Sequence, residues 1–280
     1  EMLRRQKGGA AVVMGALSLA CLLPLAGITT AHAAHVFVNT YEGDSKLFNL
    51  DADTGASTFI GNTGVNGMTD LAISSGGQLY GVTFTDFYSI NPVTGLASLV
   101  GPLVNTSSAI GLDFASDGFV YGVTGAGEFI RIDVGTGVAT VLFSTSFGYV
   151  GDVAHAGGDI FYATHLVPGS SFTTDLIEIN AANQTAVDRG AIASDVVPGL
   201  DFDADGRLLG HAVSGNSYHI PSPASSGAGN LLSVSSVGMA GAAAIPAPEP
   251  SAAAVLALGL AGMVARRRAR FAGRLGPAAS

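Results

Sequence analysis

Gly111-Leu-Asp-Phe-Ala-Ser-Asp-Gly-Phe-Val-Tyr-Gly122 is the stretch of this 280-residue chain that best reveals its architecture. An apolar run, a turn containing Asp-Gly and a second apolar run follow one another, an order typical of a β-hairpin. Similar segments begin at five positions, spaced by 41, 41, 47 and 42 residues: Asp70, Gly111, Asp152, Gly199 and Gly241. Self-similarity at such a period indicates a repeat architecture.

Each of these units continues with two more short strands. In the first unit, Phe87-Tyr-Ser-Ile-Asn91 is followed by the turn Pro92-Val-Thr-Gly95 and by an apolar run over 97–100. Four short strands in about 40 residues are the signature of a propeller blade. The pattern resembles propeller-like repeat proteins of secreted bacterial origin, which carry Leu-Tyr-Gly followed by Ile-Asn/Asp-Pro-x-Thr-Gly. This resemblance implies a fold and brings no catalytic residues.

The two ends of the repeat region complement each other. His35-Val-Phe-Val38 matches the second strand of a unit, whereas the last unit supplies only a first strand, Met239 to Ile245. Pairing of these segments would complete one blade from both termini and leave no end free to unravel. We therefore predict an all-β fold: a five-bladed β-propeller over 34–245, closed by pairing of its N- and C-terminal strands.

The N-terminal region has the features of a secretory signal peptide. Positive charges lie within 4–7, an apolar run covers 10–28, and Ala31-His-Ala33 fits a small-x-small cleavage site. We expect signal peptidase to cut after this site and to leave Ala34 as the first residue. A permanent membrane anchor is the alternative, which the cleavage site disfavours.

The C-terminal region carries a second targeting pattern. It has three parts in a fixed order: Pro248-Glu249-Pro250, an apolar run over 251–265, and Arg266-Arg267-Arg268. A helix over the apolar run would span roughly 22 Å, short of the roughly 30 Å of a hydrocarbon core. Arginines at its end can extend the span because their side chains snorkel to the interface. We therefore predict a transmembrane helix followed by a basic cytoplasmic tail.

This three-part order resembles the PEP-CTERM sorting signal of Gram-negative bacteria. In that family an integral-membrane cysteine protease-transpeptidase, exosortase, recognises the signal. The resemblance implies that Pro248, Glu249 and Pro250 form the recognition element and that the arginines over 266–268 form the cytoplasmic stop. It also implies removal of the helix and delivery to the cell surface or an exopolysaccharide matrix. One departure is the tail over 271–280, since family members usually end near the arginines.

The charge distribution agrees with this division of the chain. Eight of the 12 Lys and Arg residues lie in the terminal signals, and the segment 34–248 keeps four against 19 acidic residues, a formal charge of 4 − 19 = −15. Such a surface repels nucleic acid and anionic polymers unless divalent cations bridge them. The predicted organisation is signal peptide, 1–33; propeller, 34–245; Pro-rich stalk, 246–250; transmembrane helix, 251–265; and basic cytoplasmic tail, 266–280.

Four aspartates are candidates for a shared site: Asp70, Asp113, Asp152 and Asp201. Two precede the key apolar residue of their strand and two follow it, so all four fall on one strand face. Hard carboxylate oxygens suit Ca²⁺, which makes a calcium site one interpretation. In the other, each carboxylate accepts backbone amides from the neighbouring blade and organises the ring. We favour the second, because burying like charges together is costly.

Other chemistry-bearing residues form no motif that we can assign. His155 and His211 fall on predicted strands that could approach across a blade interface, but no nucleophile or spaced ligand motif accompanies them. Phe and Tyr lie mostly on strands, so we expect them in the core between blades and not in a sugar-stacking platform. The longest insertion, 166–174, is our first choice for contact with a partner, because binding usually resides in such loops.

These observations favour an exported, non-enzymatic binding or structural protein that signal peptidase and exosortase process. We expect it to be anchored in the membrane before sorting and to lie at the cell surface or in the extracellular matrix afterwards. Exopolysaccharide or another surface polymer is the candidate partner, nucleic acid is not, and Ca²⁺ is the only candidate cofactor. The alternative is a secreted propeller hydrolase or lyase that uses the axial aspartates with Ca²⁺.

Overall fold

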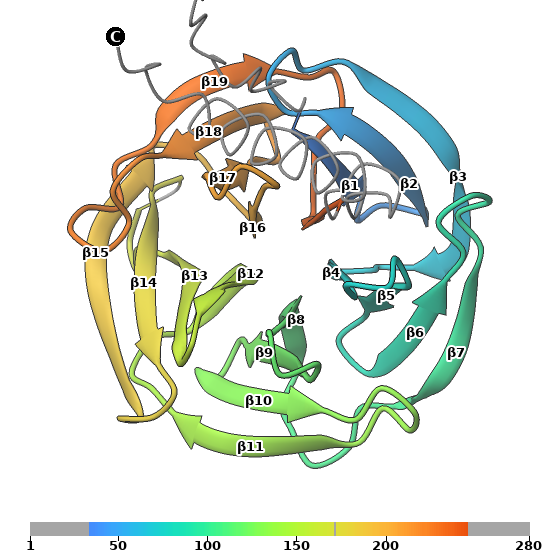
Figure 1. Cartoon of the computed structure of the whole chain (residues 1–280), viewed down its shortest axis with the longest axis horizontal. Coiled ribbons are helices and arrows are strands. Elements are labelled where there is room, and N and C mark those ends of the chain that lie inside the picture. The colour runs from blue at the N-terminus through green and yellow to red at the C-terminus, as the bar shows by residue number, and fades with distance from the viewer. Residues whose placement is uncertain (1–33, 171, 246–280) are drawn as a thin grey trace, which may run out of the picture. The chain divides into compact units, whose positions relative to one another are not determined.

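A computed structural model describes residues 34–170 and 172–245 of the chain. Over these residues, five sheets of four antiparallel strands stand around a central axis (Figure 1). The predicted five-bladed β-propeller is therefore confirmed. The predicted signal peptide, stalk, transmembrane helix and basic tail lie outside the described residues. Within the described part, no helix is both long and apolar enough to cross a membrane.

In every blade the strands follow the chain from the axis outward, except in the first, where β20 lies innermost. The first blade contains β20 (Gly241–Ala244), β1 (His35–Asn39), β2 (Asp44–Asp51) and β3 (Ser57–Asn66). The second contains β4 (Asp70–Ile73), β5 (Leu79–Val82), β6 (Asp86–Ile90) and β7 (Ala97–Pro102).

The remaining three blades repeat this order without interruption. The third contains β8 (Ala109–Phe114), β9 (Val120–Thr124), β10 (Glu128–Ile132) and β11 (Ala139–Ser144). The fourth contains β12 (Tyr149–Gly157), β13 (Ile160–Leu166), β14 (Thr174–Asn180) and β15 (Thr185–Ala193). The fifth contains β16 (Gly199–Phe202), β17 (Leu208–His211), β18 (Asn216–Ile220) and β19 (Asn230–Val234).

A recurring turn holds the third and fourth strands of a blade together. In the second blade, Asn91 Oδ1 accepts hydrogen bonds from the amides of Val93 (2.9 Å) and Thr94 (3.1 Å). Gly95 then adopts a φ of 79°, in the left-handed region that favours glycine. The equivalent Gly55 of the first blade has a φ of 76°. The Thr-Gly pairs that recur in the sequence are therefore explained by this turn.

Both ends of the described chain complete the first blade. β20 pairs antiparallel with β1, so that Val36 lies opposite Ala244 and Asn39 lies opposite Gly241. The predicted closure of the ring is therefore confirmed. Because β20 is innermost, Ile245, which follows it, lines a cavity at the axis.

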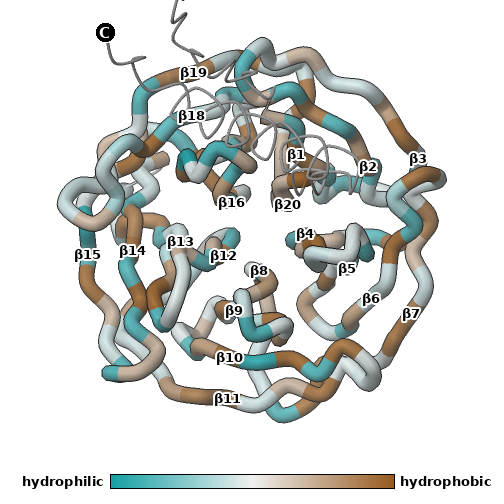
Figure 2. The backbone as a smooth tube through the Cα atoms, viewed as in Figure 1, coloured by the Kyte–Doolittle hydropathy of each residue, from teal (hydrophilic) through white to brown (hydrophobic). Residues whose placement is uncertain are grey.

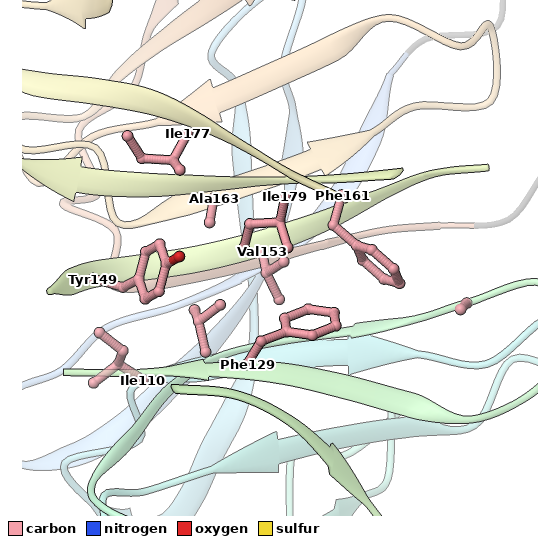
Figure 3. Packing of buried hydrophobic residues seen from close by; sticks show 10 residues of the cluster. Ile110, Phe129, Tyr149, Val153, Phe161, Ala163, Ile177 and Ile179 are labelled. Atoms are coloured by element: carbon pink, nitrogen blue, oxygen red, sulfur yellow. The ribbon is translucent and has the colours of Figure 1, made fainter. Parts of the chain in front are cut away.

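The hydrophobic core lies between the blades. Phe129 of the third blade packs against Phe161 of the fourth, with ring centroids 5.0 Å apart and Val153 buried beside them (Figure 3). Tyr80 and Phe114 join the second and third blades in the same way, at 5.6 Å. Apolar residues are spread over all five blades (Figure 2), so each interface has its own core. The aromatic residues on these strands therefore pack as predicted.

Candidate functional site

The axial carboxylates, Asp70, Asp113, Asp152 and Asp201, lie on four of the five innermost strands, β4, β8, β12 and β16. The innermost strands all run in the same direction, because every blade has the same antiparallel order. Asp70 and Asp152 occupy the first position of their strand's repeat, and Asp113 and Asp201 lie two residues further along. The four side chains therefore share one strand face at two levels of the axis.

Each axial carboxylate accepts a hydrogen bond from the backbone of the innermost strand of the next blade around the ring. Oδ2 of each residue accepts as follows: Asp70 from Leu112 N (2.6 Å), Asp113 from His155 N (2.7 Å), Asp152 from Leu200 N (2.8 Å), and Asp201 from Ala244 N. The innermost strand of the first blade, β20, carries no aspartate, and Asp70 Oδ1 accepts from Ala242 N (3.2 Å) instead. Four carboxylates thus join five strands into a closed ring.

These contacts are the ones expected if the carboxylates organise the ring. In residues 34–170 and 172–245, no group of three or more His, Cys, Asp or Glu side chains is placed to hold a metal ion. The calcium interpretation of Asp70, Asp113, Asp152 and Asp201 gains no support from this geometry, and it stays a prediction.

Burial gives the axial carboxylates unusual proton affinities. It raises the pKa of Asp70 to about 8 and the pKa of Asp201 to about 7. Burial, and then repulsion from the charge of Asp70, raises the pKa of Asp152 well above its usual range. Burial and the charge of Asp201 do the same for the pKa of Asp113. Bonds from backbone amides favour the charged forms, but the loss of hydration outweighs them.

A carboxylate cavity of about 590 Å³ opens where the innermost strands end. Asp113, Asp201 and His155 line it, together with Ser74 in the turn after β4. Asp201, whose pKa burial raises to about 7, can both donate and accept a proton at neutral pH. Serine hydroxyls, Ser74 among them, also line the cavity, but the sequence shows no nucleophile motif around them.

The opposite end of the axis is apolar. A cavity of about 520 Å³ lies where the innermost strands begin, and its lining includes Ile110, Tyr149 and Met239. A third cavity, of about 720 Å³, lies between the first and second blades. Tyr41 and Phe84 line both of these cavities. The two ends of the propeller therefore differ: the axial aspartates Asp113 and Asp201 line the cavity at one end, and the exposed rings of Tyr41 and Phe84 line the cavities at the other.

His155 and His211, whose strands could have approached across a blade interface, are not brought together. His155 lines the carboxylate cavity near the end of β12, with Nε2 3.0 Å from Gly158 O. His211 is buried opposite Gly199, at the beginning of β16, and its Nδ1 lies 3.0 Å from Ser217 Oγ. The two levels differ by three strand residues, about 10 Å. Burial lowers the pKa of His211 to about 4, so its side chain is neutral at pH 7.

The predicted processing sites lie largely outside the described residues. These are the recognition element, the cytoplasmic stop and two cleavage-site alanines: Pro248, Glu249, Pro250, Arg266, Arg267, Arg268, Ala31 and Ala33. Ala34, the expected first residue after cleavage, is described. It is buried, its carbonyl accepts a hydrogen bond from Ala52 N (2.8 Å), and its amide lies 3.3 Å from Asp53 Oδ2.

Sequence reasoning missed Tyr41 and Phe84, which it counted with the core aromatics. Both lie in connections between the second and third strands of their blades, β1–β2 and β5–β6. The insertion over 166–174, our first choice for contact, includes the equivalent connection between β13 and β14 and is therefore at the same end of the ring. Position in a turn, outside the apolar runs, was the available signal that these rings are not core residues.

Comparisons with known proteins concern the fold alone. No family model matches this chain, and no curated protein matches it. A chain of the nidogen/laminin complex is 14% identical over 73% of this chain and 82% of that chain, with a TM-score of 0.49. The hydrazine synthase of Kuenenia stuttgartiensis is 17% identical over 75% and 68%, with a TM-score of 0.44. Virginiamycin B lyase from Staphylococcus aureus is 13% identical over 80% and 73%, with a TM-score of 0.42.

Proposed function

We propose that this chain is an exported, non-enzymatic binding or structural protein, sorted to the cell surface or extracellular matrix through its C-terminal signal. One observation carries the proposal, the order of three parts: Pro248-Glu249-Pro250, an apolar run over 251–265, and Arg266-Arg267-Arg268. Signal peptidase and exosortase are the processing partners. Before sorting, the protein is held in the membrane by its C-terminal helix.

The propeller is suited to be the cargo of such a signal. The ring is complete at Ile245, whose amide donates a hydrogen bond to His35 O (3.0 Å), and the recognition element begins three residues later. A cut within 246–250 therefore removes no strand that the structure describes. The released body would carry the acidic charge of the propeller without the basic clusters of either signal.

A binding or structural role also agrees with the axis. Both oxygens of Asp70 and one oxygen of each other axial carboxylate bond to amides of other blades. Groups committed to holding strands together are poorly placed to move during a reaction. This is the reason to prefer a non-enzymatic protein over the hydrolase or lyase alternative.

Substitution of the arginine cluster tests the sorting signal. When Arg266, Arg267 and Arg268 are all changed to Ala, we expect uncut protein to remain in the membrane fraction of the native host. The reason is that the basic cluster fixes the end of the helix on the cytoplasmic side. Immunoblotting of membrane, surface and medium fractions measures this. Arg274→Ala, outside the region of resemblance, is the control and should be processed normally. Unchanged release of the triple variant would refute the sorting role.

A further inference from the structure

Two aromatic rings at one end of the propeller are not used by the core. Tyr41 and Phe84 occupy equivalent turns of the first and second blades and expose 48% and 42% of their surfaces. Their centroids lie 6.2 Å apart, with the ring planes tilted by 56°. Single exposed apolar residues are ordinary on protein surfaces, but a pair on the wall of a cavity marks a candidate binding site.

The cavity beside these rings is lined by hydrogen-bonding groups of both kinds. Asn66 offers an amide, Tyr88 a hydroxyl and Asp86 a carboxylate. Asp86 Oδ2 already accepts a hydrogen bond from Thr85 Oγ1 (2.6 Å), and a second oxygen remains for a ligand. Among the residues that the structure describes, no lysine or arginine lines this cavity. The site therefore presents flat apolar faces, donors and acceptors, and no positive charge.

This lining matches an uncharged sugar. A sugar ring has an apolar face of C–H groups that can lie on an aromatic ring, and hydroxyls that both donate and accept hydrogen bonds. An anionic sugar would find no counter-charge in the cavity and would be repelled by a body of charge 4 − 19 = −15. A cationic ligand would use only the acceptors of the cavity, whereas sugar hydroxyls can also accept hydrogen bonds from Asn66 and Tyr88.

We propose that Tyr41 and Phe84 form a stacking platform for a neutral polysaccharide, whose hydroxyls bond in the cavity lined by Asn66, Asp86 and Tyr88. This inference rests on the proposed function, because it names the polymer that a surface or matrix protein would hold. The same two rings also line the apolar cavity at the axis, so a chain can cross from one cavity to the other over them. A polymer can contact both cavities at once, whereas a single sugar can contact only one of them.

Affinity electrophoresis of the full chain in detergent tests the proposal. The gels contain one of four neutral polysaccharides, an α-glucan, a β-glucan, a mannan and a galactan, or the anionic polygalacturonate. We expect at least one neutral polymer to retard the chain and polygalacturonate not to. Tyr41→Ala and Phe84→Ala should each weaken the retarding affinity about tenfold, and Tyr41→Phe should keep it.

Phe119→Ala is the matched control. Phe119 is 47% exposed, much as Tyr41 and Phe84 are, but it lies in the β8–β9 turn at the opposite end of the blades and covers Arg131 at 4.7 Å. The proposal is overturned if no neutral polymer retards the chain, if only the anionic one does, or if Phe119→Ala weakens binding as much as Tyr41→Ala. Melting curves of each variant verify that it is folded. Sorting is read separately by fractionation, so a parent chain that is sorted normally but binds no neutral polymer refutes only this inference.

Discussion

At the scale of single residues, Asp70 differs from the other axial carboxylates because it bonds to both neighbouring blades. Its Oδ2 accepts from Leu112 N on one side and its Oδ1 accepts from Ala242 N on the other. Because the side chain is fully buried, its charged form lacks hydration, and its pKa rises to about 8. Asp70 therefore links the stability of the propeller to pH.

The sign of this linkage follows from proton counting. An aspartate whose pKa is raised on folding keeps its proton in the native state while the unfolded chain has released it. The stabilising contribution is fully present below pH 4 and is lost as pH rises through about 7 to 8. Asp53 and Glu128 have lowered pKa values, and their opposite contributions lie mostly below pH 5. His211, whose pKa is lowered to about 4, adds stability as pH rises to about 6.5, but it is one group against the four axial aspartates.

We therefore predict that the melting temperature falls between pH 5 and pH 8.5, and that Asp70→Asn makes this fall smaller. At pH 5 the variant should also be less stable, by about 1–3 kcal/mol, because an amide cannot accept hydrogen bonds through both of its ends. Calorimetry across this pH range measures both effects. Asp159→Asn, at an exposed position of the β12–β13 turn, should leave the pH profile unchanged. A melting temperature that rises toward pH 8.5 would contradict the assignment.

At the scale of elements, the innermost strands alternate between aspartate and glycine at the first repeat position. Gly111 of β8 lies between β4 and β12, whose first repeat positions are Asp70 and Asp152. A Cβ atom at Gly111 would come within 2.5 Å of Gly151 O and 2.8 Å of Asp152 Cα. The glycine is therefore required because two backbones approach closely, and not because of an unusual turn.

Gly111→Ala should destabilise the propeller by about 1–3 kcal/mol, since the clash is with backbone that cannot rotate away. Urea unfolding at pH 5 measures the change. The control is Gly125→Ala, where a Cβ would meet nothing within 4 Å and the expected change lies within about 0.5 kcal/mol. Equal stability of Gly111→Ala and the parent chain would show that β8 and β12 can move apart at no cost.

The strands could be predicted from the sequence because their signals are local and repeated. The Thr-Gly turn at Gly95 and the closing strand before Ile245 both follow from comparing one unit with the next. The platform of Tyr41 and Phe84 could not be predicted, because it depends on two turns, 43 positions apart in the sequence, meeting at one end of the ring. The same limit applies to His211, whose partner Ser217 shares no motif with it.

At the scale of the whole molecule, aspartate and glycine cannot alternate perfectly at the first repeat position, because the number of blades is odd. The first repeat position reads Asp, Gly, Asp, Gly, Gly around the ring, so two glycines, Gly199 and Gly241, meet where the fifth blade joins the first. This junction is reinforced further out by an ion pair, in which Arg207 Nη1 lies 2.9 Å from Asp53 Oδ1. Alternation therefore fails beside the first blade, the one in which β20 pairs with β1.

Closure by β20 is therefore expected to control the stability of the whole ring. Without residues 239–245, Asp70 and Asp201 would each lose a backbone donor, at about 1–3 kcal/mol for each buried group left unpaired. β1 would become an unpaired edge strand open to association. A chain ending at Ile245 keeps all of these contacts and differs from the shorter chain by seven residues.

We predict that a chain truncated after residue 245 unfolds at about the same temperature as the full chain, whereas one truncated after residue 238 melts lower or aggregates. Adding a synthetic peptide of residues 236–245 should restore the melting temperature of the shorter chain, because the peptide can pair with β1 and bind only the folded ring. A peptide with Ala243→Pro is the control, since proline cannot donate to the ladder within a strand. Equal melting of the two truncated chains, or equal rescue by both peptides, would show that the ring does not depend on its last strand. Rescue by the unmodified peptide alone would separate closure of the ring from every effect of the tail that follows it.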